Sequence, residues 1–499
     1  MKKHYSISIP HCLPPAVLAL SLLAIYLRTL APGLSWANNG ADGADLITAV
    51  VTGGIPHPTG YPLYILLAEL FQALPVGSLA FRTNLLSAIA TSLAAVLLYM
   101  TVVRFLDVES PGHSWPAGLV AGYAFGLAPL VWSQAVITEV YALQALLTAL
   151  VMYFFTAGWI AQKNQDRLRG LSLGLAMGNH ITAIFLAPLV IFGNAGRRSS
   201  PSRDGSFDYQ AILSRSLFVF VGLAVYLILP WRASSNPPIN WGNPSTPDGL
   251  WWLVSGRLYA ENLHSLTGAE ALSRIQAWAD LLMGQWGLLG LSLAFFGLAF
   301  TFSPSNLYTF TIWQAVFYSA FAMLYDSPDS YVYLIPVCIS FSIWIGLGLS
   351  GMMNSTFAQR YGRGIPIFLV CLLYLFGLAA YHMPQVDASK DLRAESFGRE
   401  VISIAPQDAI VFAKGDRAVF TLWYFQFALD ERPDIAIVAT DLLHFDWYAE
   451  MLRRHNVSLK IPAPFPWPET IIHNNPSLPV CYVESAEQPL IDCRQPEGN

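Results

Sequence analysis

Long apolar runs alternate with short polar segments over most of the chain. A run of about 18 to 25 apolar residues can cross the ~30 Å hydrocarbon core of a bilayer as a helix. The pattern therefore predicts membrane helices that each cross once, near residues 13–31, 82–105, 116–134, 136–160, 211–231, 281–302, 306–324, 331–350 and 364–383.

A further apolar stretch, residues 169–193, is predicted to enter and leave the membrane on one side. Gly178, Asn179 and His180 interrupt it midway, and the basic segments "KNQDRLR" and "GRRSSPSR" flank its two ends. Because basic loops stay in the cytoplasm, two short helices that turn near His180 fit this stretch. The sequence thus predicts about eleven transmembrane helices.

The basic residues also predict the orientation of the chain. With a cytoplasmic N-terminus, residues 33–81, residues 232–280 and everything after about 384 lie outside. The cytoplasmic loops then hold most of the basic residues, namely Lys2, Lys3, Arg104, Lys163, Arg167, Arg169, Arg197, Arg198, Arg203, Arg215, Arg360 and Arg363.

The start of the chain has a second interpretation. "MKK", an apolar stretch and "SWA" at residues 35–37 also fit a cleavable signal peptide. A retained first helix is favoured, because Arg28 interrupts the late part of the stretch and further apolar runs follow.

Composition supports a polytopic membrane protein. Of the 499 residues, 54% are hydrophobic and only 12% are charged, unlike a soluble protein of this size. The net charge of −5 and the lack of a basic run argue against a nucleic-acid partner. The lipid bilayer is the expected environment.

Residues 384–499 differ from residues 1–383, because charges become frequent and apolar runs shorten. "DAIVFA" and "DIAIVAT" fit short buried strands, while "DLRAESFGREVISIA" and "RAVFTLWYFQFAL" fit helices. The sequence predicts a small extracytoplasmic α/β domain here, after a transmembrane domain of residues 1–383. Cys481 and Cys493 could form a disulfide there, which the sequence leaves open.

The sequence lacks the motifs of several classes of membrane enzyme and pump. The sequence has no P-loop, no paired CxxC and no HExxH, which argues against an ATP-driven pump and an integral metalloprotease. No metal-binding residues and no cofactor are predicted, and a requirement for a divalent metal stays open.

The first outer loop, "NNGADGADLITAVVTGGIPHPTGYPLY", carries the candidate chemistry. Asp42 and Asp45 share a face near the start of a predicted helix, where free N–H groups favour anions. A helix cap is the plain alternative. The Pro and Gly residues of "HPTGYP" favour a loop of fixed shape.

This loop belongs to a set of ordered motifs that resembles one protein family. The set comprises "DGADLITAVVTGGIPHPTGYPLYILLAELFQALPVGSLAFRTNLLSA", "WSQAVITEVYALQ", "GLAMGNHIT", "LPWRASSNPPINWGNPST", "YDSPDSYVYLIP" and "FAKGDRAVFTLWYFQ". It is similar to a large family of polytopic proteins, long described only by a domain of unknown function, that includes the animal transmembrane protein O-mannosyltransferase.

The resemblance implies the GT-C architecture, in which a multi-helix membrane glycosyltransferase takes a sugar from a polyprenyl-phosphate carrier at the extracytoplasmic face. An acidic residue of the first outer loop is then the expected catalytic base, which is Asp42 here. The family commonly has Asp-Ser-Gly-Glu where this chain has Asp42-Gly43-Ala44-Asp45, so the catalytic role of Asp45 stays open.

Other residues are candidates for binding the donor or the acceptor. Arg82 and Arg232 could grip the lipid phosphate, or they could only snorkel at the interface. His57 and Tyr61 of the first loop could contact substrate or brace the loop. Glu139 and His180 are further candidates, and their alternative role is a buried structural hydrogen bond. Trp241 is the last candidate, and its alternative is a place in the interfacial aromatic belt.

Two further motifs fit either a ligand site or a turn. Asp326 and Asp329 lie in "YDSPDSY", and Lys414 and Asp416 lie in "AKGDR" at the predicted end of a strand.

Together these features predict an inverting GT-C-type glycosyltransferase that uses a polyprenyl-phosphate sugar. Mannose is the expected sugar, and the acceptor is a hydroxyl group of an exported protein, a glycan or a lipid. A transporter or flippase of lipid-linked sugars is the alternative. Because the compact chain resembles bacterial members, a bacterial plasma membrane is the expected location.

Overall fold

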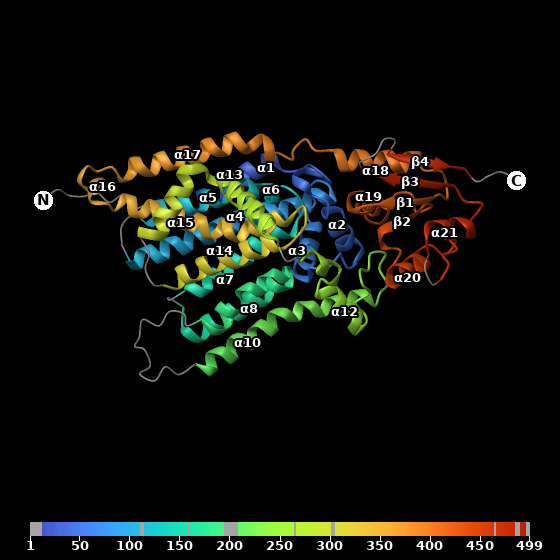
Figure 1. Ribbon diagram of the computed structural model, residues 1–499, viewed down its shortest axis with the longest axis horizontal. Coiled ribbons are helices and arrows are strands. Elements are labelled where there is room, and N and C mark those ends of the chain that lie inside the picture. The colour runs from blue at the N-terminus through green and yellow to red at the C-terminus, as the bar shows by residue number, and fades with distance from the viewer. Residues whose placement is uncertain are drawn as a thin grey trace.

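The computed structural model describes residues 12–109, 114–157, 160–193, 208–263, 266–300, 305–463, 466–484 and 490–495. A long bundle of helices occupies one end of the molecule and a small sheet with its own helices occupies the other (Figure 1). The basic residues Lys2, Lys3, Arg197, Arg198 and Arg203, on which the predicted orientation partly depends, lie outside the described residues.

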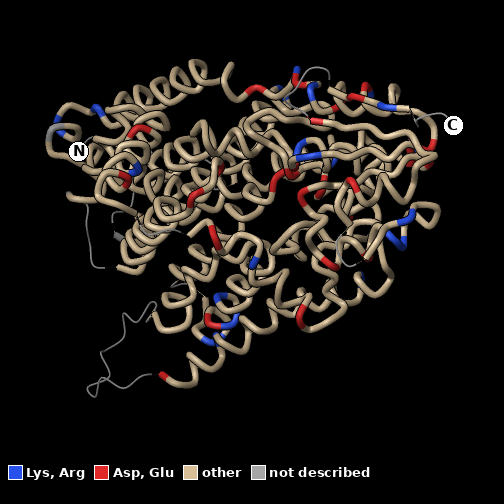
Figure 2. Tube along the Cα trace, turned by 45° about the vertical axis from the view of Figure 1, so that its right-hand side comes forward, with Lys and Arg blue, Asp and Glu red and all other residues tan. Residues whose placement is uncertain are grey.

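The bundle consists of helices whose apolar residues face one another or the surroundings. Its helices are α1 (Leu13–Thr29), α4 (Leu79–Glu109), α5 (Ser114–Gly126), α6 (Pro129–Ala135), α7 (Val140–Thr156), α8 (Gln162–Asn179), α9 (Ala187–Phe192), α10 (Tyr209–Leu223), α11 (Ile228–Ala233), α13 (Gly268–Phe300), α14 (Asn306–Leu324), α15 (Ile335–Met353), α16 (Thr356–Arg360) and α17 (Gly364–Val386). Figure 2 shows that long stretches of these helices carry no charged residue.

Six helices of the described residues are long and apolar enough to cross a membrane, and a bent helix pair makes a possible seventh. The prediction of a multi-pass membrane protein is therefore confirmed. Eleven crossings stay a prediction, because α1 and α7, with 17 residues each, are shorter than the other candidates.

The bent pair corrects the prediction of one continuous helix at 116–134. Helices α5 and α6 meet at an angle of 68°. Pro129 begins α6, and the preceding Ala128 is extended, with φ −63° and ψ 127°. Proline lacks an N–H group and disfavours a helical residue before it, so the chain breaks here.

The turn predicted at His180 is confirmed, since α8 ends at Asn179 and a 3₁₀ turn (Ile181–Leu186) leads into α9. Helix α8 packs closely against α10 through small residues. A Cβ atom on Gly174 would lie 2.2 Å from the carbonyl oxygen of Val219, so only glycine allows this approach.

Three short helices lie in the predicted outer loops, namely α2 (Gly43–Thr52), α3 (Pro62–Gln72) and α12 (Pro247–Val254). A short parallel bridge joins the two loops, because the Ile55 N–H donates to the Ile239 carbonyl and the Trp241 N–H donates to the Ile55 carbonyl. The first loop is therefore held in a fixed shape.

The C-terminal part forms a sheet of four described strands in the order β2-β1-β3-β4. Its elements are α18 (Arg393–Ile404), β1 (Ile410–Lys414), α19 (Asp416–Trp423), β2 (Ala436–Ala439), α20 (Asp446–His455), α21 (Pro468–Asn474), β3 (Val480–Glu484) and β4 (Ile491–Arg494). The four predicted elements α18, β1, α19 and β2 are confirmed. Strands β3 and β4 were not predicted. The boundary at residue 384 and the extracytoplasmic location stay predictions.

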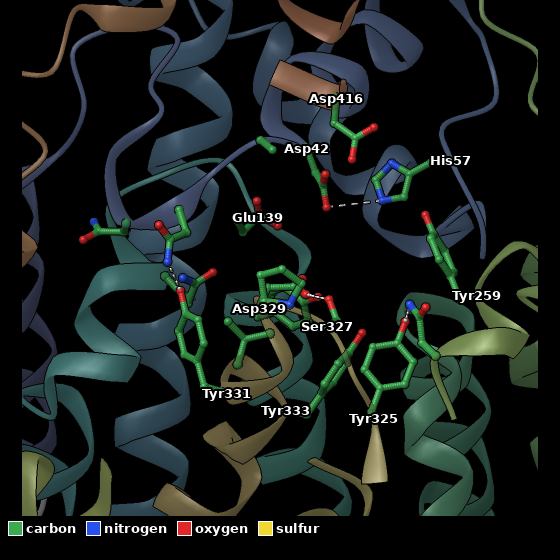
Figure 3. Close-up of a pocket in the computed structure, with 18 of the residues that line it drawn as sticks. Asp42, His57, Glu139, Tyr259, Tyr325, Ser327, Asp329, Tyr331, Tyr333 and Asp416 are labelled. Atoms are coloured by element: carbon green, nitrogen blue, oxygen red, sulfur yellow. Dashed lines mark hydrogen bonds and ion pairs between the residues drawn. The ribbon is translucent and has the colours of Figure 1, made fainter. Parts of the chain in front are cut away.

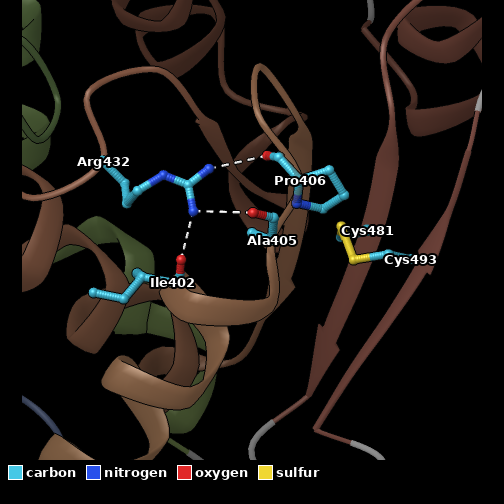
Figure 4. The surroundings of a disulfide bond; sticks show 6 residues. All are labelled: Ile402, Ala405, Pro406, Arg432, Cys481 and Cys493. Carbon is cyan, nitrogen blue, oxygen red and sulfur yellow. Dashed lines mark hydrogen bonds between the residues drawn. A yellow bond between two sulfur atoms is a disulfide. The ribbon is translucent and has the colours of Figure 1, made fainter.

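One disulfide and the hydrogen bonds of one arginine stabilise the C-terminal part (Figure 4). Cys481 of β3 and Cys493 of β4 form a disulfide between paired positions of the antiparallel strands. Arg432 donates to the carbonyl groups of Ile402, Ala405 and Pro406 at the end of α18. These donors satisfy carbonyl groups that a helix end leaves unpaired.

Candidate active site

A cavity of about 380 Å³ opens where the first outer loop, the 325–333 segment and the start of α19 meet (Figure 3). Four carboxyl groups line it, those of Asp42, Glu139, Asp329 and Asp416. Tyrosine rings supply most of its aromatic wall, from Tyr61, Tyr141, Tyr259, Tyr325, Tyr331 and Tyr333. Carboxylates, amides and aromatic rings together suit a ligand with many hydroxyl groups.

Asp42 presents its carboxyl group to this cavity. It precedes α2 at the N-cap position but makes no capping hydrogen bond, so the plain alternative of a helix cap does not apply. Its side chain is 30% exposed, and its Oδ2 lies 3.5 Å from His57 Nε2. Burial raises the pKa of Asp42 to about 6, although the charge of His57 opposes the rise.

His57 lies between two aspartates. Its backbone N–H and its Nδ1 both contact Asp45 Oδ2, at 2.9 and 2.7 Å, while its Nε2 faces Asp42 and the Tyr61 hydroxyl. Burial lowers the pKa of His57, but the charges of Asp42 and Asp45 outweigh burial and raise it to about 9. The imidazolium form therefore prevails at neutral pH, with both ring N–H groups facing acceptors.

Asp45 is completely buried and does not line the cavity. Its second oxygen accepts a hydrogen bond of 3.1 Å from the indole Nε1 of Trp241. Asp45 therefore contacts His57 from behind the cavity wall, and a catalytic role for Asp45 stays a prediction. Trp241 is likewise buried, among Phe420, Trp423 and other rings, which places it behind the cavity wall.

Glu139 and His180, which lie far from the first loop in sequence, come close to the site. Glu139 lines the cavity, and its Oε2 is buried without a hydrogen-bond partner among the described residues. His180 lies beneath the wall, with its ring 5.9 Å from Tyr61 and 5.7 Å from Tyr333. Its Nδ1 contacts the Thr182 hydroxyl, which fixes the ring. Because the fixed ring packs against Tyr61 and Tyr333, His180 supports these tyrosines.

The two arginines predicted to bind phosphate do not line the cavity. Arg82 donates to the carbonyl groups of Gln72, Val76 and Gly77, and it braces the end of α3. Arg232 is buried, pairs with Glu69 and donates to the Gly54 carbonyl. Both guanidinium groups are thus occupied by the protein itself.

Sequence reasoning missed several residues of the wall. Tyr259, Tyr325, Tyr331 and Tyr333 face the cavity, as Figure 3 shows, although only the aspartates of "YDSPDSYVY" were considered as ligands. Arg417 also lines the cavity and directly follows Asp416 in "AKGDR". Tyr325, Tyr331, Tyr333 and Arg417 lie within motifs already recognised, whereas Tyr259 lies in none of them.

The described residues were also compared with the ligand sets of metal sites. Among the described residues, no group of three or more His, Cys, Asp or Glu side chains is arranged to hold a metal ion. The requirement for a divalent metal stays open.

Comparisons with known proteins identify this fold. The chain superposes on apo ArnT from Cupriavidus metallidurans with a TM-score of 0.61 and 11% identity, covering 94% of this chain and 92% of that one. ArnT from the same organism bound to undecaprenyl phosphate gives a TM-score of 0.61, 12% identity and the same coverage. The fold and the cavity define a multi-pass membrane protein of the GT-C class.

Sequence comparisons agree. The Protein O-mannosyl-transferase TMEM260 N-terminal domain matches residues 42–200, and the TMEM260-associated domain 2 matches residues 394–490. The chain belongs to the TMEM260 family.

Two relatives are similar over most of this chain. Protein O-mannosyl-transferase TMEM260 of Mus musculus is 26% identical over 491 residues, and its counterpart in Dictyostelium discoideum is 23% identical over 489 residues. The matches cover 89% and 87% of this chain, but the chain spans only 65% and 58% of the lengths of these relatives. Because both relatives are eukaryotic, a bacterial plasma membrane stays a prediction.

Proposed function

We propose that this chain is a membrane glycosyltransferase that moves a sugar from a polyprenyl-phosphate carrier to a hydroxyl group. The observation that carries the proposal is the pair Asp42 and His57 on the wall of a cavity rich in carboxyl groups and tyrosines, with Asp45 buried behind His57. The names of the relatives and the ArnT-like fold support it.

Asp42 is the general base of the proposed reaction. The acceptor oxygen attacks C1 of the sugar, its proton passes to Asp42, and the bond from C1 to the phosphate oxygen breaks with its electron pair. A pKa of about 6 keeps Asp42 ionised at neutral pH while leaving it more basic than an ordinary aspartate. One displacement of this kind inverts the configuration at C1.

His57 and Asp45 have positioning roles in this mechanism. The imidazolium of His57 keeps Asp42 oriented and limits the rise of its pKa. Asp45, buried behind the ring, holds that imidazolium through Nδ1 and the backbone N–H. In this mechanism the other carboxyl groups bind sugar hydroxyls and the tyrosine rings stack on the sugar ring.

Mannose as the sugar and a protein as the acceptor follow the names of the mouse and Dictyostelium relatives, and Ser or Thr of an exported protein is our narrower proposal. Donor and acceptor vary among proteins that share one fold, so these choices need their own test.

The test uses the purified full chain in lipid vesicles with a panel of polyprenyl-phosphate sugars and a Ser/Thr-containing peptide. Free polyprenyl phosphate and peptide-bound sugar are both measured. We expect equal amounts of both products from one donor, with loss of both in a folded Asp42→Asn variant. Asp248→Asn is the matched control, since this exposed carboxylate of α12 lies outside the cavity. Movement of intact donor across the bilayer without release would instead indicate a transporter.

A further inference from the structure

A second cavity, of about 450 Å³, adjoins the Asp42 cavity. The two cavities share four lining residues, Asn38, Asn39, Tyr331 and Arg417. A single ligand can therefore extend from one cavity into the other past Arg417.

The two cavities differ in charge. Four carboxyl groups line the Asp42 cavity, whereas none of the described carboxyl groups lines the second cavity. The second cavity holds Arg393 and shares Arg417 with the first cavity, and amide groups such as that of Gln285 also line it. A phosphate group is thus repelled by the first cavity and attracted to the second.

The second cavity also lies beside candidate membrane spans. Leu130 in the second half of the bent pair α5–α6 and Gln385 at the end of α17 line it, and Leu281 within α13 lines it as well. A phosphate carried on a lipid is held at this depth, between hydrocarbon and water. Leu130 and Leu281 offer apolar contacts for the first isoprene units.

Arg417 has a guanidinium group available for a ligand. Its Cζ lies 5.9 Å from the centre of the Trp36 ring, which steadies the side chain. Within the described part of the chain, no ion pair or hydrogen bond occupies this guanidinium, unlike those of Arg82, Arg232 and Arg393. Arginine offers paired N–H donors that match phosphate oxygens.

The sheet topology places Arg417 where α/β sheets bind ligands. Strand β1 pairs in parallel with β2 on one side and with β3 on the other, so the chain switches direction across the sheet beside β1. Arg417 follows the carboxyl end of β1 by three residues. Ligands of open parallel sheets bind outside the carboxyl ends of strands at such a switch point.

We propose that Arg417 binds the phosphate of the lipid-linked donor at the junction of the two cavities. This assignment rests on the proposed function. The sugar then lies in the Asp42 cavity and the isoprenoid begins in the second cavity. When the bond from C1 to the phosphate oxygen breaks, the electron pair remains on the phosphate, and Arg417 stabilises the added negative charge.

The test is equilibrium binding of polyprenyl monophosphate to the detergent-purified full chain, with uncharged polyprenol and inorganic phosphate as separate probes. We expect Arg417→Gln to weaken binding of polyprenyl monophosphate by about tenfold or more, because a charge-assisted contact is lost. Arg417→Lys keeps the charge without the paired donors, so we expect its affinity for polyprenyl monophosphate to lie between those of the wild type and Arg417→Gln. We expect polyprenol to bind the wild type and Arg417→Gln with equal affinity. We expect inorganic phosphate to bind the wild type far more weakly than polyprenyl monophosphate does.

Arg399→Gln is the matched control. Arg399 of the C-terminal part also lies over an aromatic ring, 5.5 Å from the centre of Phe425, but it lines neither cavity. We expect it to bind polyprenyl monophosphate like the wild type. An equal loss of affinity for polyprenyl monophosphate in Arg417→Gln and Arg399→Gln would overturn the assignment. So would an equal loss of affinity for polyprenol in Arg417→Gln, because either result would indicate a general effect on the structure.

The remaining outcomes separate this assignment from the proposed function. Wild-type affinity in Arg417→Gln, with the wild type still preferring polyprenyl monophosphate to polyprenol, overturns only the role of Arg417. A wild type that binds polyprenol as tightly as polyprenyl monophosphate overturns the donor class itself. Inorganic phosphate that binds as tightly as the lipid phosphate contradicts the lipid part of the assignment.

Discussion

Asp45→Asn removes one negative charge from behind His57 and leaves the shape of the buried side chain nearly unchanged. The carboxylate of Asp45 accepts hydrogen bonds from the His57 backbone, the His57 ring and the Trp241 indole. An asparagine cannot accept all three, because its amide nitrogen is a donor. His57 then loses both its charged partner and part of its fixed orientation.

The size of the effect follows from these contacts. A hydrogen bond to a charged group contributes about 1.5–3 kcal/mol, which corresponds to a loss of roughly tenfold to a hundredfold in kcat/KM. The pH dependence changes as well. Without Asp45, the pKa of His57 falls from about 9, so the ring loses its charge at lower pH. The charge of His57 lowers the pKa of Asp42 by more than the charge of Asp45 raises it, so the pKa of the base rises where the ring becomes neutral.

The assay is kcat/KM for sugar transfer between pH 5 and 8, within the range where His57 is charged in the wild type. Asp42 acts only when ionised, so activity falls as the pH drops through its pKa. We expect Asp45→Asn to move this acid limb to higher pH. Asp45→Glu restores the charge, and we expect it to return the acid limb toward that of the wild type. A variant Asp45→Asn with an unshifted limb would refute the positioning role.

Three other predictions follow from the structure. Wild-type activity falls as the pH drops through about 6, the pKa to which burial raises Asp42, and a pH-rate profile that stays flat from pH 5 to 7 would contradict this. Arg432→Ala lowers the free energy of unfolding of the C-terminal part by about 1–3 kcal/mol, as measured by denaturant unfolding, because three carbonyl groups at the end of α18 lose their donor. Gly174→Val lowers the yield of monodisperse protein in gel filtration, whereas Gly284→Val, which meets no atom within 4 Å, does not; equal yields would contradict the close packing of α8 against α10.

Much of the fold was predictable because apolar length and periodicity are local properties of the sequence. The elements α18, β1, α19 and β2 and the turn at His180 agree with prediction. The break at Pro129 was missed because the apolar run continues through it, although a proline inside a helical pattern indicates a break. Strands β3 and β4 are short, and β3 pairs with β1, which lies far away in the sequence, so local patterns do not reveal the pairing.

The site was predictable where its residues are close in sequence. Asp42, Asp45 and His57 fall within one loop, and the loop's fixed shape brings them together. Arg417 lies more than 300 residues away and reaches the same cavity only through the packing of the C-terminal part. Arg82 and Arg232 were chosen by charge and predicted side of the membrane, but which carbonyl or carboxylate occupies a guanidinium depends on tertiary contacts.

The central claim is that Asp42 takes the proton of the acceptor. The most direct measurement is the single-turnover rate of sugar transfer at saturating donor for the wild type, Asp42→Asn and Asp248→Asn, with donor affinity measured separately. We predict a loss of at least about a hundredfold in Asp42→Asn alone, with donor binding retained. A folded Asp42→Asn variant that transfers sugar at the wild-type rate would contradict the assignment of Asp42 as the base.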